Sequence, residues 1–198
     1  MELDASQRKV RLSVGELATF RNRPRPCGNG SNLWRAVVGR QWHKSSENLI
    51  KAEHPEARFE VTVSADWRHS NWLFQLNGRI DQLLPTSEGA LVREVKTIRS
   101  PLPMPDKTLL EDYPAYFAQA ATYQSMLEVL PEYAGQLITA EVQFINIENG
   151  ALQSVSLGPS EHAIFKKQLD QLIPFLNERL ESLNRLREAQ IKPAFDTL

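Results

Sequence analysis

The chain has 198 residues, of which 41% are hydrophobic and 24% charged, a composition typical of a globular protein with one substantial core. No run approaches the roughly 18 consecutive apolar residues that a membrane span needs, and the N-terminal segment has no apolar signal core. The single cysteine, Cys27, excludes an intramolecular disulfide and a four-thiolate metal site. We therefore expect one cytoplasmic domain over residues 1–198, with no membrane as a partner.

The net charge of −1 is unevenly spread along the chain. Residues 1–50 hold nine lysines and arginines against four acids, a balance of +5, so the remainder carries −6. A basic segment beside an acidic site suits a substrate with a phosphate backbone. A solvated basic surface without a partner is the alternative interpretation.

Residues 1–56 are predicted to form a basic, helical N-terminal part. A short helix over residues 12–20 is indicated by Ser13 as N-cap and Glu16 at the third position after it, the arrangement of a capping box. A segment rich in proline and glycine then ends this helix.

A second helix is predicted from residue 31 or 32 to about residue 52. Within it, His43 falls on the same stripe as Ile50, which we expect to face the body of the protein. A histidine in such a place is either a satisfied core residue or a ligand, and the spacing alone favours the core residue.

Residues 57–157 are predicted to form a sheet core with an inserted helix. Alternating and apolar runs predict strands over residues 58–67, 72–84, 90–98, 139–147 and 152–157. Between the third and fourth strands, residues 99–114 contain four prolines and are expected to be a loop beside the candidate site, followed by a helix over residues 115–130. Residues 158–198 are expected to form C-terminal helices, kinked or divided at Pro174.

The candidate site lies on the second and third of these strands. Because alternate side chains share a face of a strand, Glu94 and Lys96 project together, and strand pairing brings Asp81 beside them. Two close carboxylates repel each other unless a cation lies between them, and oxygen ligands of this kind suit magnesium or manganese. A solvated face with an ordinary cross-strand ion pair is the alternative.

The helix over residues 115–130 supplies two further candidates. Gln119 and Tyr123 are four residues apart and share one face, from which they could hydrogen-bond a phosphate or a base edge. The alternative is a helix edge at which these polar groups cap the core.

Taken in order, these residues resemble a known family. The set comprises His43, Gly78-x-x-Asp81, Glu94-x-Lys96 and Gln119-x-x-x-Tyr123. It is similar to the motifs of the RecB-like branch of the PD-(D/E)XK nuclease superfamily, which includes CRISPR-associated adaptation exonucleases and nuclease domains fused to helicases. The similarity covers roughly residues 12–130. Each motif is weak alone, but four in this order are fairly specific.

The resemblance implies an α/β (α+β) fold, with a central mixed sheet flanked by helices in a restriction-endonuclease-like nuclease core. It also implies that His43, Asp81 and Glu94 bind the metal, with the backbone carbonyl of Val95 as a further ligand. Lys96 would position or activate the attacking water, and Gln119 and Tyr123 would contact the substrate. Glu60 is a possible extra acid. Many relatives carry four cysteines for an iron–sulfur cluster, which Cys27 alone cannot hold.

The hypothesis is therefore a magnesium- or manganese-dependent DNA nuclease without an iron–sulfur cluster. It would hydrolyse phosphodiester bonds, as an exonuclease on DNA ends or single strands, in DNA repair, recombination or defence. Family analogy adds a helicase domain or subunit as a possible partner. A catalytically silent DNA-binding module of the same fold is the alternative, and a metal enzyme acting on a small phosphoester is a third and less favoured interpretation.

Overall fold

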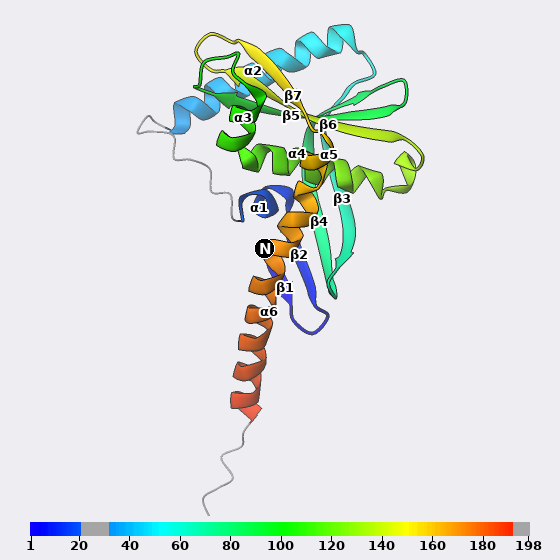
Figure 1. The fold of residues 1–198 in the computed structure, drawn as a ribbon, viewed down its shortest axis with the longest axis vertical. Helices are drawn as coiled ribbons and strands as arrows, with labels where there is room; N and C mark the ends of the chain where they lie inside the picture. The colour runs from blue at the N-terminus through cyan, green and yellow to red at the C-terminus, as the bar shows by residue number, and fades with distance from the viewer. Residues whose placement is uncertain (21–31, 192–198) are drawn as a thin grey trace, which may run out of the picture.

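The structure is a computed structural model that describes residues 1–20 and 32–191; some side chains in the second long segment, near its two ends and at residue 43, fall outside this description. A central mixed sheet carries helices on both faces (Figure 1). In chain order the elements are β1 (Glu2–Asp4), β2 (Lys9–Ser13), α1 (Val14–Thr19), α2 (Asn32–Glu53), β3 (Arg58–His69), β4 (Trp72–Pro85), β5 (Gly89–Ile98), α3 (Asp106–Asp112), α4 (Pro114–Glu128), η1 (Pro131–Tyr133), β6 (Leu137–Asn146), β7 (Leu152–Ser156), α5 (Pro159–His162) and α6 (Ile164–Ile191).

The seven strands of the described chain form one sheet in the order β1-β2-β4-β5-β6-β7, with β3 paired to β4. β3, β4 and β5 form an antiparallel meander, β5 and β6 run parallel, and β6 and β7 form an antiparallel hairpin. The predicted α/β fold with a central mixed sheet is therefore confirmed, as are the five strands predicted within residues 57–157. The parallel step from β5 to β6 requires a crossover connection, which α3 and α4 supply.

The N-terminal part differs from the prediction that residues 1–56 are helical. β1 and β2 form a hairpin, and β2 joins the sheet parallel to β4. Val10 and Leu12 of β2 are buried while Arg11 between them is exposed, which is the alternation of a strand. The predicted capping box is present, but its N-cap Ser13 is the last residue of β2 and begins the shorter helix α1.

Two helices cover opposite faces of the sheet around β5 and β6 (Figure 1). α4 lies on the face that carries Val92 and Phe144, and the ring of its Phe117 is 6.0 Å from the Phe144 ring. α2 lies on the other face, where Ser46 donates a hydrogen bond to Gln143 of β6. The main apolar core lies between the sheet and α4, and α1 and α6 contribute to it.

One prediction for the remaining segments is wrong, and a second is wrong in part. The proline-rich segment predicted as a loop contains α3, which is held by the fully buried Leu109. α6 is not divided at Pro174 but continues through it, while the alternative of a kink at Pro174 stays a prediction. A proline costs a helix interior about 3 kcal/mol, and the burial of Leu172 and Leu176 on either side offsets this cost. No helix within the described residues is both long and apolar enough to cross a membrane.

One edge of β4 is shared between two partners, and the change of partner leaves a short free section. β3 pairs along the other edge of β4. On the shared edge, β2 pairs with residues 73–77 and β5 pairs with residues 82–85. Residues 78–81, the Gly-x-x-Asp motif, have no strand partner on this edge within the described chain. The motif therefore marks the place where β4 and β5 separate.

Gly78 allows α4 to approach this free section closely. A Cβ atom at residue 78 would lie 2.6 Å from Cε1 of Tyr123 and 2.9 Å from Cγ2 of Val14. In place of a strand partner, the Tyr123 hydroxyl accepts a hydrogen bond of 3.0 Å from the backbone N–H of Arg79. The missing side chain at residue 78 thus sets the spacing between β4 and α4.

Replacing this glycine is expected to destabilise the protein. The Cβ of Gly78→Ala must displace either the Tyr123 ring or β4, so we expect the free energy of unfolding to fall by about 1–3 kcal/mol in urea titrations. Gly15→Ala is the matched control, because the nearest atom to its new Cβ is 4.0 Å away and alanine favours the helix α1. A Gly78→Ala protein as stable as the parent would contradict the close approach.

Candidate active site

β3 and β4 pair on either side of Glu60 and Asp81 but not at these two residues. On one side, Val61 belongs to the core under α4. On the other side, Phe59 lies beneath the Lys51 ammonium of α2. Residues two apart normally share one face of a strand. Here Phe59 and Val61 lie on opposite faces of the sheet, so the β3–β4 pair twists sharply between them. Glu60 has a φ of 52°, in the left-handed region that glutamate rarely adopts, and this conformation accompanies the turn.

Asp81 projects into the gap between β4 and β5. Its Oδ2 atom accepts a hydrogen bond of 2.8 Å from the backbone N–H of Val95. The carboxylate thus replaces the β4 backbone as the partner of β5. The predicted placement of Asp81 beside Glu94-x-Lys96 is confirmed.

Glu94 and Lys96 project from the same face of β5, as the alternation predicts. The Nζ atom of Lys96 lies 2.6 Å from Oε1 of Glu94 and 5.3 Å from the centroid of the Tyr116 ring. The side chain of Glu94 is 2% exposed and that of Lys96 is 22% exposed. This pair is therefore not a solvated cross-strand ion pair, because both residues belong to one strand and the carboxylate is buried.

Burial and charge perturb both groups. Burial raises the pKa of Glu94 to about 7; the Lys96 ammonium opposes this change and the Asp81 carboxylate adds to it. Burial also disfavours the charged form of Lys96, but the Glu94 and Asp81 carboxylates outweigh that effect, and the pKa of Lys96 is raised. An additional cation between the two carboxylates would stabilise their ionised forms.

The structure shows a contact of Tyr123 that the sequence does not predict. Its side chain is only 4% exposed, and its hydroxyl already accepts the Arg79 N–H. Burial and the Glu94 carboxylate raise the pKa of the hydroxyl, which therefore stays neutral. Tyr123 holds the free section of β4 through this hydrogen bond, and its contact with a substrate stays a prediction. Gln119, one turn earlier on α4, is half-buried, and its substrate contact stays a prediction.

Several predicted residues remain untested. His43 belongs to α2, but its side chain lies outside the described residues, so its role as a metal ligand stays a prediction. The backbone carbonyl of Val95 as a ligand is likewise a prediction. Part of the basic N-terminal segment, together with Cys27, also lies outside the described residues.

Two further residues at the site are not predicted as functional by the sequence patterns. Tyr116 places its ring beside the Lys96 ammonium; its position three residues before Gln119 on the same helix is a signal for it. Arg79 binds Tyr123 through its backbone, and only its place inside the Gly-x-x-Asp motif points to it.

The carboxylates fit a divalent cation at a specific atom. Oε2 of Glu94 is buried and has no hydrogen-bond partner among the described residues. An unpaired buried carboxylate oxygen costs free energy, and coordination to a hard cation offsets that cost. Asp81 supplies a second carboxylate. Among the side chains that the structure describes, which do not include that of His43, no three acids, histidines or cysteines gather as one metal-binding group.

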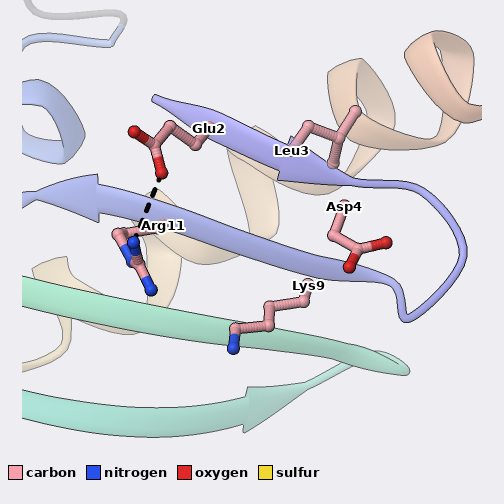
Figure 2. Close-up of a pocket in the computed structure, with 5 residues that line it drawn as sticks. All are labelled: Glu2, Leu3, Asp4, Lys9 and Arg11. Atoms are coloured by element: carbon pink, nitrogen blue, oxygen red, sulfur yellow. Dashed lines mark hydrogen bonds and ion pairs between the residues drawn. The ribbon is translucent and has the colours of Figure 1, made fainter.

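Two surface hollows do not include these residues. One lies at the β1–β2 hairpin and is lined by Glu2, Leu3, Asp4, Lys9 and Arg11, with Arg11 Nη1 3.5 Å from Glu2 Oε2 (Figure 2). The other lies between α2 and the β6–β7 hairpin and includes Trp42 and Arg93. The candidate site is thus a gap between strands and does not coincide with either hollow.

A mixed sheet in which two strands part around a carboxylate pair and a lysine, with a helix on each face, defines a nuclease core. In a comparison with protein families, the sequence model of the PD-(D/E)XK nuclease superfamily matches residues 11–195. The chain therefore belongs to the PD-(D/E)XK nuclease superfamily.

Solved structures that share the fold include the following two. One is a candidate exonuclease from Eubacterium rectale, with a TM-score of 0.55, 10% sequence identity, and coverage of 92% of this chain and 88% of the other. A second is the protein SSO0001, with a TM-score of 0.53, 17% identity, and coverage of 87% of this chain and 76% of the other. No curated protein matches the sequence. At these identities the likeness concerns the fold alone.

The raised pKa of Glu94 predicts a pH-dependent stability. Between about pH 4.5 and about pH 7 the folded chain keeps a proton that the unfolded chain releases, so in chelator the free energy of unfolding falls as the pH rises. Lys96 stays protonated in both states over this range, because its pKa is raised. Glu94→Gln removes the contribution, so from about pH 5 to about pH 8 the variant gains up to about 3 kcal/mol relative to the parent. Urea unfolding measures both proteins, and parallel pH curves would contradict the shift.

Proposed function

We propose that this nuclease is a divalent-metal-dependent deoxyribonuclease, with Mg²⁺ or Mn²⁺ as its cofactor, that hydrolyses phosphodiester bonds in DNA. The observation that carries the proposal is the buried Glu94. Lys96 binds one of its oxygens, and the other lacks a hydrogen-bond partner among the described residues. Membership of the PD-(D/E)XK nuclease superfamily supports the nuclease chemistry.

Asp81 and Glu94 would hold the cation, with the Val95 carbonyl and His43 as further donors. A divalent cation bound there polarises a phosphoryl oxygen and offsets the charge that develops in the transition state. Lys96, fixed by Glu94, keeps its ammonium beside the reacting phosphate, where it orients the attacking water. The low exposure of Glu94 strengthens each of these electrostatic interactions.

The subfamily, the mode of cleavage, the location and the biological role are proposed on the motifs and on family analogy. A place in the RecB-like branch is supported by the four ordered motifs. Exonuclease action on ends or single strands is supported by that place and by the name of the Eubacterium rectale structure. A cytoplasmic location, a role in DNA repair, recombination or defence, and a helicase domain or subunit as a partner rest on family analogy.

A catalytically silent DNA-binding module is the second candidate. This candidate needs no complete metal site, and the side chains that the structure describes, which do not include that of His43, contain no group of three possible ligands. It predicts DNA binding that depends on salt and not on metal. The two candidates differ most clearly in cleavage.

Cleavage of end-labelled single- and double-stranded DNA tests the proposal, with magnesium, manganese or chelator. Asp81→Asn, Glu94→Gln and Lys96→Gln are each expected to slow cleavage by about 100-fold or more, because each removes charge from the site. Glu88→Gln is the control, an exposed carboxylate between β4 and β5 that is expected to keep the parental rate. Parental rates in the Asp81 and Lys96 variants would place the site elsewhere. No cleavage by the parent, with DNA binding retained, supports the silent module.

Metal binding can be measured without cleavage. A ligand of the folded state alone raises the free energy of unfolding by about 2.7 kcal/mol at 100 times its dissociation constant, so Mn²⁺ is expected to raise the Tm of the parent in a saturable way. Asp81→Asn is expected to weaken this effect. The effect grows from about pH 6 to about pH 8, because Glu94 must lose its proton to bind. A Tm independent of Mn²⁺ would contradict the proposed metal site.

A further inference from the structure

Arg79 lies in the free section of β4, two residues before Asp81. Its backbone N–H is held by the Tyr123 hydroxyl, and Gly78 before it packs against the same ring. The Arg79 side chain is 67% exposed. A fixed backbone with an exposed guanidinium is a suitable base for a contact with an incoming ligand.

Glu60 orients this guanidinium. The Glu60 carboxylate forms an ion pair with the Nε atom of Arg79. An arginine has five N–H donors in a planar fork, and a side chain that is 67% exposed presents donors to the solvent in addition to the Nε atom bound by Glu60. Glu60 is also the residue with the left-handed backbone opposite Asp81, so the same turn of β3 that accompanies the placement of Asp81 also brings Glu60 to Arg79.

The acidic side chains of the site would repel the phosphates of a DNA strand, and an exposed cation such as Arg79 would offset this repulsion. Asp81, Glu94 and Glu60 are all acids, with Glu60 opposite Asp81 on the neighbouring strand and Glu94 on the far side of the gap. The ammonium of Lys96 is bound to Glu94 and only 22% exposed. A phosphodiester strand that approaches these acids therefore needs an accessible cation, and a guanidinium binds phosphate oxygens through paired N–H donors.

We propose that Arg79 binds a backbone phosphate of the DNA strand beside the phosphate that is cleaved, and that Glu60 positions its guanidinium. The proposal rests on the proposed nuclease function and adds a substrate contact to it. Because only a phosphate is contacted, the interaction does not read the base sequence.

The test is the salt dependence of DNA binding in chelator, where no metal-dependent cleavage occurs. Short fluorescein-labelled oligodeoxynucleotides, single-stranded and duplex, report the Kd by anisotropy over a series of KCl concentrations. The slope of log K against log salt counts the phosphates neutralised, at about 0.7 per phosphate on single strands and about 0.9 on duplexes. Arg79→Gln is expected to weaken binding for every sequence and to reduce the slope by about one such step. A purely structural role would leave the slope unchanged.

Three variants separate contact from charge and from fold. Arg68→Gln removes an exposed arginine of β3, about 26 Å along the strand from Glu60, and is expected to keep the parental slope. The double variant Glu60→Gln with Arg79→Gln leaves the net charge unchanged, and its slope is expected to fall as in Arg79→Gln. Arg79→Lys keeps the charge without the fork, so we expect the parental slope with weaker binding. Thermal unfolding verifies that each variant folds.

The proposal is overturned if the folded double variant binds DNA with the parental slope and Kd. In that case the proposed nuclease function still stands if the parent protein cleaves DNA and the Asp81→Asn variant does not. Failure of the parent to cleave DNA would instead remove the nuclease function, whatever the slope of the Arg79 variants.

Discussion

A single hydrogen bond, from the backbone N–H of Val95 to the carboxylate of Asp81, joins β4 to β5 at the point where their backbones part. A regular ladder would satisfy that N–H with a carbonyl of β4 and would leave no room between the strands. With a side chain as acceptor, β5 keeps its parallel pairing to β6 through Ile98, while on the same edge β4 changes its partner between β5 and β2. The gap that results is the candidate site, and one of its two carboxylates is the group that holds it open.

The surrounding residues make the opening stable. Gly78 admits the Tyr123 ring, whose hydroxyl satisfies the Arg79 N–H that no strand reaches. Glu60, opposite Asp81, has a left-handed backbone conformation. For a residue other than glycine, such a conformation costs roughly 1–3 kcal/mol. Strained residues of this kind persist where the neighbouring structure fixes them, and they concentrate at functional sites. Here the strain accompanies the turn of the β3–β4 pair that places Asp81 between the strands.

Much of this architecture is predictable from local patterns, since alternation in β3 to β7 and the breakers between them identify the meander and the hairpin. The pairing of Glu94 with Lys96, and Asp81 beside them, follows from strand geometry alone. The strand β2 is not predicted, because its short Val10–Leu12 alternation directly precedes a strong capping box, and it becomes a strand through pairing with β1 and with the distant β4. The buried role of Tyr123 is equally invisible in the sequence, since it depends on how closely α4 approaches Gly78.

The burial of Glu94 distinguishes between the two candidate functions. A surface that only attracts the DNA backbone works through exposed charge, and it gains nothing from a buried carboxylate with one oxygen that lacks a hydrogen-bond partner in the described chain. Such a group lowers stability, and a neutral side chain of similar shape would cost less. The cost is understandable if the carboxylate must bind a cation in a water-poor gap, where each electrostatic interaction with a reacting phosphate is stronger than at the surface. The Tyr116 ring beside Lys96 acts in the same direction, because it shields from water the ammonium that must stay next to Glu94. The arrangement of this part of the sheet therefore favours catalysis over binding alone.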